Sequence, residues 1–206
     1  MHHLEQAINT MKVVFLDRDG VINRDTGYVH QWQNFEYIEG ALEGMRILNK
    51  NGFEIVIITN QSGIARGLYT ENDFAQLSQK MLRHLQENGI KILNLFYCPH
   101  HPSGIVKKYT CECDCRKPQP GMLIRAAEVH GIELKKSILI GDKPSDIIAA
   151  RNAGVHYAYH VQSENKESNV TIKEADRSFP SLLDCASWIE KNNPLTLPPT
   201  ATPNSK

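Results

Sequence analysis

Five short apolar runs alternate with helix-like segments along most of the chain, and this alternation constrains the fold more than any other feature. The runs cover residues 12–17, 53–59, 92–98, 137–142 and 155–161. Their β-branched and aromatic residues predict strands, and their nearly continuous apolar character predicts burial on both faces of a sheet. Strands that alternate with helices favour parallel pairing through right-handed crossovers. The predicted fold class is α/β, a Rossmann-like parallel sheet with helices on both faces.

Helical patterns fill the gaps between these runs. They cover residues 41–52, 70–89, 120–131, 144–154 and 180–191. Most of them end at a glycine, and Thr70 stands where an N-cap is expected. We predict a single domain over residues 11–191 with no separate cap domain, because no connection is long enough to hold one. Residues 192–206 are rich in proline and threonine, which predicts a flexible tail.

The composition argues against several classes of protein. A chain of 206 residues, 41% hydrophobic and 22% charged, is long enough to bury a core. Lys and Arg together number 23, and so do Asp and Glu, so no global charge favours nucleic acid or an anionic membrane. No run approaches the ~18 apolar residues of a membrane span, and the first ten residues lack the apolar stretch of a signal peptide. We expect a cytoplasmic monomer with no nucleic-acid or membrane partner.

Polar side chains follow three of the predicted strands, at the edge where parallel sheets bind ligands. Asp17 and Asp19 follow the first strand two residues apart, so their side chains point to the same side. Thr59 ends the second strand, and Asp142 ends the fourth. The segment around Asp17 alone is also an ordinary turn sequence. All the strand ends together offer carboxylates for Mg²⁺ or for nucleophilic attack on phosphorus.

Four motifs occur in order over residues 12–160: FLDRDGVIN, TNQSGIARG, CDCRKPQPGM and GDKPSD. They resemble the haloacid dehalogenase superfamily of phosphotransferases, and with GYVH and YCPHHP they resemble its histidinol-phosphatase-like branch. The resemblance implies a Mg²⁺-dependent phosphatase that acts on a small phosphosugar through an aspartyl-phosphate. Histidinol phosphate is an alternative substrate, and a catalytically silent phosphosugar-binding module is a second alternative.

The same resemblance implies roles for the residues at the strand ends. Asp17 would be the nucleophile, and Asp19 the general acid and then the general base. The oxygens of the phosphoryl group would be held by Thr59, Asn60 and Lys117. Mg²⁺ would be bound by Asp17, Asp142 and the backbone carbonyl of Asp19. Asp146 has two interpretations, as a residue that supports the metal or as a residue near a helix start.

Contacts with the substrate are also implied by the resemblance. The candidates are Asp25, Thr26, Gly27 and Tyr28 in one loop, Gln61 and Ser62 after the second strand, Arg116, and Lys143. For residues 25–28 the alternative is a plain polar turn. Arg116 is the candidate for a second, distal phosphate, because its planar guanidinium matches phosphate oxygens.

Residues 98–118 hold four of the five cysteines and two adjacent histidines. Without a signal peptide, such a cluster favours metal binding or catalysis over disulfides, and a set of free surface thiols is the alternative. Cys98 and His100, followed by Cys113 and Cys115, provide the ligands of a Cys₃His zinc site. Cys111 and His101 compete for two of these places, and the resemblance to CDCRKP favours the first set. Cys185 is expected to be a buried core residue.

A four-ligand zinc site leaves no position for an activated water, so the predicted Zn²⁺ is structural. Arg116 and Lys117 directly follow the last candidate ligand. We therefore predict a zinc-stapled loop that holds these two cations in place.

Overall fold

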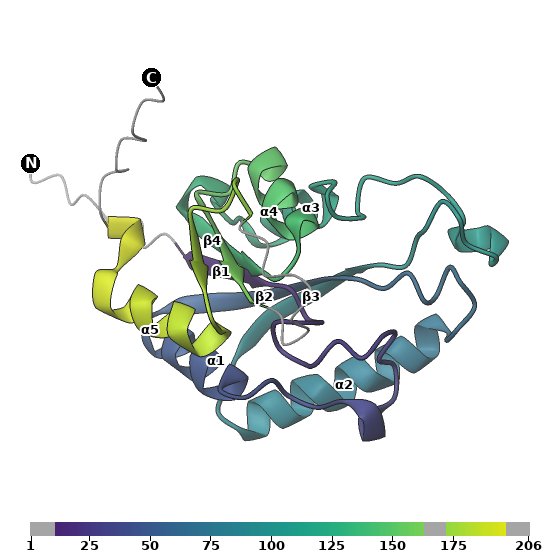
Figure 1. Ribbon diagram of the computed structural model, residues 1–206, viewed down its shortest axis with the longest axis horizontal. Coiled ribbons are helices and arrows are strands. Elements are labelled where there is room, and N and C mark those ends of the chain that lie inside the picture. Colours follow the sequence, from purple (N-terminus) through teal and green to yellow (C-terminus); the bar gives the residue numbers. More distant parts are fainter. Residues whose placement is uncertain (1–10, 163–171, 197–206) are drawn as a thin grey trace, which may run out of the picture.

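All five apolar runs predicted to be strands are strands in the computed structural model, which describes residues 11–162 and 172–196 (Figure 1). The strands are β1 (Lys12–Leu16), β2 (Phe53–Asn60), β3 (Ile92–Cys98), β4 (Ser137–Gly141), β5 (Tyr157–Val161) and β6 (Arg177–Phe179). The helices are α1 (Ala41–Lys50), α2 (Glu71–Glu87), α3 (Gly121–His130), α4 (Pro144–Ala153) and α5 (Leu182–Asn192). The predicted α/β fold is confirmed.

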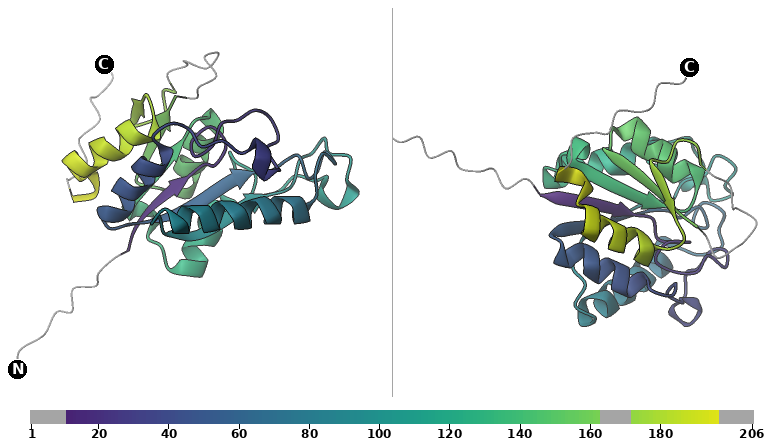
Figure 2. Two further views of the ribbon diagram at one scale, coloured as in Figure 1. Left: turned by 90° about the horizontal axis from the view of Figure 1, so that it is seen from below. Right: turned by 60° about the vertical axis from the view of Figure 1, so that its left-hand side comes forward.

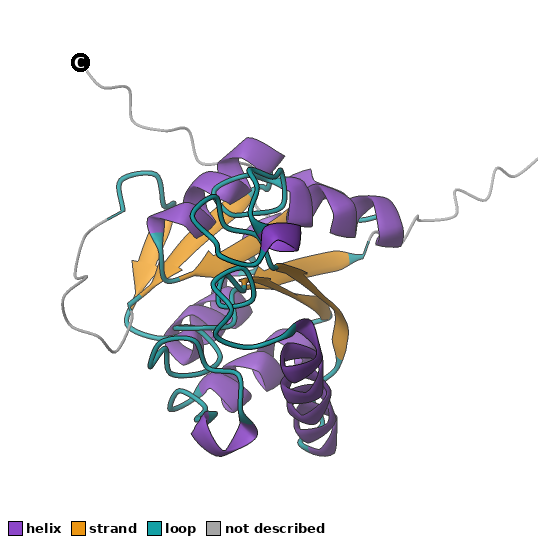
Figure 3. Cartoon of the chain, turned by 90° about the vertical axis from the view of Figure 1, so that its right-hand side faces the viewer, coloured by secondary structure: helices purple, strands orange, loops and turns teal. Residues whose placement is uncertain are grey.

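The strands form a single parallel sheet in the order β3-β2-β1-β4-β5-β6. Successive side chains of a strand point to opposite faces, so Val14 and Leu16 of β1 join one core, and Val13 and Phe15 join the other. Helices α1, α2 and α5 pack on the first face, and α3 and α4 pack on the second. Figures 2 and 3 show the sheet between these two helical layers. Burial on both faces explains why the central strands are apolar at nearly every position.

The helix ends follow the local sequence. Thr70 caps α2 and forms a capping box with Asp73, as its position predicted. Gly131 and Gly154 end α3 and α4 in the left-handed conformation. Ser181 accepts a hydrogen bond from the backbone of Asp184 at the start of α5.

Two parts of the chain differ from the sequence-based expectation. The edge strand β6 was not predicted, because its three residues, Arg-Ser-Phe, contain only one apolar side chain. Residues 192–196, expected to begin a flexible tail, complete α5 and form a 3₁₀ turn (Pro194–Thr196) in which Leu195 packs against the core. The rest of the predicted tail, residues 197–206, lies outside the described residues.

Two long loops define the functional end of the molecule. Residues 17–40 connect β1 to α1, and residues 99–120 connect β3 to α3, so both loops leave the carboxyl edge of the sheet (Figure 1). Neither loop contains more than a short 3₁₀ turn, and within the described ranges no second domain covers the sheet. None of the helices in the described ranges is both long and apolar enough to cross a membrane.

Candidate active site

The carboxyl ends of β1, β2 and β4 border a polar cavity of ≈ 360 Å³. Its lining residues are Asp17, Asp19, Asp25, Gly27, Tyr28, Thr59, Asn60, Gln61, Ser62, Tyr69, Arg116, Lys117, Lys143, Ser145 and Asp146. The structure thus brings together nearly all of the catalytic and substrate-contact residues proposed from the sequence. Thr26 is the exception, because it is exposed and does not line the cavity.

A buried lysine lies between two carboxylates at the floor of this cavity. The Nζ atom of Lys117 is 2.9 Å from Oδ1 of Asp17 and 2.6 Å from Oδ1 of Asp146, and it donates to the carbonyl of Ile58 at 3.2 Å. Burial opposes the charged ammonium, but the charges of Asp146 and Asp17 raise the pKa of Lys117 above its usual range. Lys117 is therefore a fixed cation beside Asp17.

Asp142 lies close to the same two carboxylates. One oxygen from each of Asp17, Asp142 and Asp146 lies within 4.8 Å of the others, and all three residues are buried. The backbone approaches Asp142 closely at Gly20, whose φ is +92° and where a β carbon would lie 2.1 Å from Oδ2 of Asp142. A side chain at position 20 would displace this carboxylate.

Crowding and burial raise the pKa of two of these groups, Asp17 and Asp142. Burial, with repulsion from Asp146 and against the attraction of Lys117, raises the pKa of Asp17 to about 6. Burial and the charge of Asp17 raise the pKa of Asp142 to about 8. In addition, Oδ1 of Asp142 is buried and has no hydrogen-bond partner among the described residues. Hard carboxylate oxygens with this arrangement are the ligands that Mg²⁺ prefers, so the residues present fit a Mg²⁺ site.

Asp19 is held apart from that group by three neighbouring side chains. Its Oδ1 accepts hydrogen bonds from Nε and Nη2 of Arg18, at 3.1 and 2.8 Å, and from Asn23 at 3.0 Å. Its Oδ2 accepts from Nη2 of Arg18 at 2.9 Å and from Gln61 at 3.0 Å. Burial alone would raise its pKa, but the Arg18 charge and these hydrogen bonds lower the pKa of Asp19 below its usual value. The free site therefore holds Asp19 as a carboxylate.

Asn60 is used to position the loop that carries Lys117. Its amide nitrogen donates to the Lys117 carbonyl, and its amide oxygen accepts from the Lys117 backbone N–H, both at 3.1 Å. These two bonds join the end of β2 to residue 117 of the second loop. The two groups of the Asn60 side chain are thus already paired within the protein, although the residue lines the cavity.

The loop 25–28 reaches the edge of the cavity through an ion pair. Nζ of Lys143 donates to Oδ2 of Asp25 at 2.8 Å, and Oδ1 of Asp25 accepts from the backbone N–H of Gly27 at 3.1 Å. Tyr28 adopts a left-handed backbone with φ of 53° and is 45% exposed. Asp25, Gly27 and Tyr28 thus line the cavity together with Lys143.

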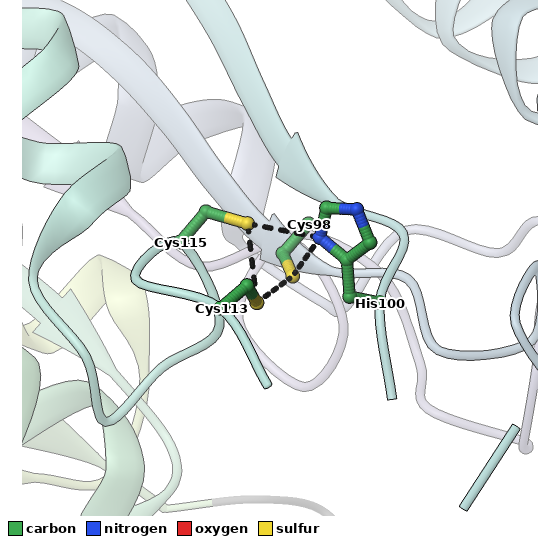
Figure 4. A group of neighbouring side chains, drawn as sticks. All are labelled: Cys98, His100, Cys113 and Cys115. Carbon is green, nitrogen blue, oxygen red and sulfur yellow. Dashed lines mark hydrogen bonds between the residues drawn. The ribbon is translucent and has the colours of Figure 1, made fainter. Parts of the chain in front are cut away.

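Four potential zinc ligands lie together at the base of the second loop (Figure 4). The Sγ of Cys98 is 3.6 Å from the Sγ of Cys113 and 3.8 Å from Nδ1 of His100. The Sγ of Cys115 is 3.4 Å from the Sγ of Cys113 and 3.3 Å from Nδ1 of His100. A tetrahedral zinc ion with Zn–S of ~2.3 Å and Zn–N of ~2.05 Å needs ligand separations of about 3.5–3.8 Å. These four atoms therefore fit a structural Zn²⁺ site.

The two competing ligands lie outside this group. Cys111 is exposed, and His101 directs Nε2 toward Nη2 of Arg66 at 3.0 Å while its Nδ1 accepts from the backbone of Ser103. Cys185 is buried in the core, as expected. Hydrogen bonding to Cys98 and burial raise the pKa of the Cys115 thiol. A bound cation would reverse that shift, because zinc binds the thiolate form.

Known proteins share this sequence and this architecture. The chain is 42% identical over 182 residues to D-glycero-beta-D-manno-heptose-1,7-bisphosphate 7-phosphatase of Escherichia coli K12, an alignment that covers 88% of this chain and 95% of that one. It is 45% identical over 163 residues to D-glycero-alpha-D-manno-heptose-1,7-bisphosphate 7-phosphatase of Photorhabdus laumondii, over 79% and 89% of the two chains. The chain belongs to the heptose-bisphosphate phosphatase family. A family model described as HAD-hydrolase-like also matches residues 114–184.

Solved structures agree with this family membership. A D,D-heptose 1,7-bisphosphate phosphatase from B. bronchiseptica, complexed with magnesium and phosphate, superposes with a TM-score of 0.76 at 30% identity, covering 88% of this chain and 99% of that chain. As a member of this haloacid dehalogenase-like family, the protein is a phosphatase, a phosphoric monoester hydrolase.

Some residues of the phosphatase site were not singled out from the sequence. Tyr69 and Ser145 line the cavity, and Arg18 and Asn23 bind Asp19. Arg18 had a weak signal, because it stands between the two aspartates. Tyr69 lies ten residues after Thr59, past a turn, and no local pattern indicates that the chain returns to the cavity there.

Proposed function

We propose that this phosphatase removes the 7-phosphate of D-glycero-D-manno-heptose 1,7-bisphosphate, a step of ADP-heptose biosynthesis, with Mg²⁺ as cofactor. The observation that carries the proposal is the pairing of two cations on one loop: Lys117 at the cavity floor and Arg116 in the cavity lining. A bisphosphate needs one cationic site for each phosphate, and the relatives named above carry this substrate in their names.

Asp17 would attack phosphorus and form an aspartyl-phosphate, releasing the sugar oxygen. Lys117 lies 2.9 Å from the attacking carboxylate and would hold an equatorial phosphoryl oxygen, where Thr59 would assist from the end of β2. Mg²⁺, held by Asp17, Asp142 and the backbone carbonyl of Asp19, would supply positive charge that lets a phosphate approach the carboxylates. Asp146 supports this arrangement through its ion pair with Lys117 and through a hydrogen bond to the backbone of Lys143.

Asp19 would carry the proton in both half-reactions. The negative charge of a bound phosphoryl group raises the pKa of a neighbouring carboxyl group, so Asp19 would be protonated in the substrate complex and could protonate the leaving sugar oxygen. The resulting carboxylate would then remove a proton from the water that hydrolyses the aspartyl-phosphate. Its hydrogen bonds to Arg18, Asn23 and Gln61 would keep it aligned for the second step.

We also propose that Cys98, His100, Cys113 and Cys115 bind one structural Zn²⁺. Its role would be to fix the loop that carries Arg116 and Lys117, the two residues that directly follow Cys115. All five cysteines are unpaired, which suits a reducing compartment and is our basis for placing the enzyme in the cytoplasm, where we expect a monomer.

The decisive test compares catalytic efficiencies with Mg²⁺ present. Substrates are the α and β anomers of heptose 1,7-bisphosphate, a hexose monophosphate, and histidinol phosphate. We expect the highest kcat/KM for a heptose bisphosphate. A highest value for histidinol phosphate would overturn the substrate assignment, and an absence of turnover with every phosphate ester would favour a silent binding module.

A further inference from the structure

Gln61 makes more side-chain hydrogen bonds within the protein than its predicted role as a substrate contact requires. The residue is buried, and its Nε2 donates to Oδ2 of Asp19 at 3.0 Å and to Oγ1 of Thr59 at 2.7 Å. Its Oε1 accepts from the hydroxyl of Tyr69 at 2.6 Å. The backbone N–H of Gln61 donates to the carbonyl of Cys98 at 2.8 Å, which ties residue 61 to the end of β3.

The chemistry of the neighbours fixes the orientation of this amide. Oδ2 of Asp19 already accepts a hydrogen bond from Nη2 of Arg18, so it acts as an acceptor here and the NH₂ end of Gln61 faces it. The amide oxygen must then face Tyr69, whose hydroxyl donates to it. Replacing either partner would let the amide rotate, and the bond to Asp19 would lose its fixed direction.

Two contacts besides its hydrogen bond hold the Tyr69 ring in place. A β carbon on Gly63 would lie 2.1 Å from Cε1 of Tyr69, so the ring lies directly against the backbone there. Tyr69 also stacks on His30 with ring centroids 4.8 Å apart and planes 9° from parallel. Nδ1 of His30 is 2.8 Å from the carbonyl of Tyr28, in the loop at the cavity edge.

The two oxygens of Asp19 differ in their remaining capacity to exchange a proton. Oδ1 accepts three hydrogen bonds, two from Arg18 and one from Asn23. Oδ2 accepts two, and one of these comes from an Arg18 nitrogen shared with Oδ1. Oδ2 is thus the less saturated oxygen, and it is the one that Gln61 holds.

We propose that Gln61 is a positioning residue for Asp19, oriented by Tyr69, and that it aims Oδ2 at the oxygen of the leaving group. The inference rests on the proposed acid role of Asp19. It replaces the predicted role of Gln61 as a substrate contact. Through Tyr69 and His30, the same chain of contacts connects the loop that carries Tyr28 to the proton-transferring carboxylate.

Two aryl phosphates of nearly the same shape test the proposal. Phenyl phosphate has a basic leaving group that needs protonation, whereas p-nitrophenyl phosphate leaves as a stabilised anion and needs little help. We use kcat/KM, because it reports the steps up to formation of the aspartyl-phosphate. Gln61→Leu should lower kcat/KM about tenfold or more for phenyl phosphate and less than about twofold for p-nitrophenyl phosphate. Tyr69→Phe, which removes only the hydroxyl, should also lower the ratio of kcat/KM for phenyl phosphate to kcat/KM for p-nitrophenyl phosphate, by a smaller factor than Gln61→Leu.

Tyr37→Phe is the matched control, since it removes a phenol hydroxyl that contacts His84 on α2 instead of the cavity. Its ratio of the two efficiencies should equal that of the wild type. Equal losses on both aryl esters in the Gln61 and Tyr69 variants would overturn the proposal in favour of a purely structural role. A loss confined to heptose bisphosphate, with both aryl esters unaffected, would overturn it in favour of direct substrate contact. A wild-type enzyme that hydrolyses aryl phosphates but not heptose bisphosphate would count against the proposed function and leave this test intact.

Discussion

The two groups of potential metal ligands lie at the same edge of the sheet but are built in different ways. The carboxylates of Asp17, Asp142 and Asp146 belong to the ends of the adjacent central strands β1 and β4 and to the start of α4, and all are buried. In the cysteine group only Cys98 belongs to a strand, the edge strand β3, and the other three ligands lie in the 99–120 loop and are half-buried.

This difference shows which parts of the site depend on bound metal for their shape. Asp17 is fixed by the sheet, since its backbone N–H continues the ladder to the Ile140 carbonyl at 3.1 Å. Because the fold holds these buried carboxylates close together, their negative charges repel one another. The loop has further anchors besides the cysteine group. Asn60 bonds the backbone at residue 117, the Ala65 carbonyl accepts from the backbone of Ile105 and Val106, and Glu71 at the start of α2 accepts from the side chains of residues 108 and 109. We infer that Mg²⁺ completes a site that the fold already forms, whereas Zn²⁺ helps to form the loop itself.

The largest effect should come from the sheet-borne group. Asp17→Asn keeps the shape of the side chain but removes the attacking charge, so kcat should fall by at least about a thousandfold. The thermal midpoint should stay the same or rise, because the variant removes one of the crowded carboxylates. Activity and differential scanning calorimetry check both parts. Substantial turnover by this variant would exclude the aspartyl-phosphate mechanism.

The next effect should come from the loop-borne group. Cys113→Ser should abolish binding of about one zinc per chain and lower kcat/KM about a hundredfold. Arg116 loses its fixed position, and Lys117 is then held only by Asn60 and by its carboxylate partners. Hydrogen exchange should become faster in residues 98–117 before it does so in the sheet. Cys111→Ser is the control, since this exposed thiol lies outside the group, and it should behave as the wild type. A zinc-free variant with full activity would show that the loop needs no metal.

A smaller effect should separate the two cations of the loop. Arg116→Ala should leave chemistry at Asp17 intact but remove the contact with a distal phosphate. A charged hydrogen bond contributes about 1.5–3 kcal/mol, so kcat/KM for heptose 1,7-bisphosphate should fall about tenfold to a hundredfold. Efficiency with a hexose monophosphate, which has no second phosphate, should change little. Equal losses on both substrates would assign Arg116 to positioning of the loop.

The same contrast explains how far the sequence could predict the molecule. The strands β1, β2 and β4 are buried on both faces, so their apolar runs were unambiguous, and the residues directly after them were found with them. Cys98, His100, Cys113 and Cys115 were found because zinc requires particular ligand types at short spacings.

Contacts that depend on tertiary packing could not be predicted in this way. Tyr69 reaches the cavity only because the turn after β2 folds back against Gly63. The hydrogen bonds of Gln61 and Asn60 to other protein groups could not be predicted either, because a polar residue at a strand end can bind either substrate or protein. The ion pair of Lys117 with Asp146 joins a residue of the 99–120 loop to one in the first turn of α4, and no local pattern marks it.

The smallest predicted effect concerns stability, and it tests how far ionisation of the buried carboxyl groups destabilises the fold. Folding raises the pKa of Asp17 to about 6 and of Asp142 to about 8, so the folded protein favours their protonated forms. The stability that this provides is present below the unfolded value near 3.8 and is lost as pH rises through 6 and 8. Mg²⁺ binds the ionised carboxylates, so the stabilisation that it gives should increase over the same range.

The thermal midpoint, measured with and without Mg²⁺ while zinc is retained, should therefore show a difference of a few degrees that grows from pH 6.5 to 8.5. Burial lowers the pKa of His160, which destabilises the fold only as pH falls below about 6.5, so this window isolates the carboxylates. Asp142→Asn removes the carboxyl group whose pKa is raised to about 8 and should abolish most of the growth with pH. A Mg²⁺ effect that does not depend on pH would show that these buried carboxylates are ionised at every pH in this range. The fold would then hold them close together without raising their pKa.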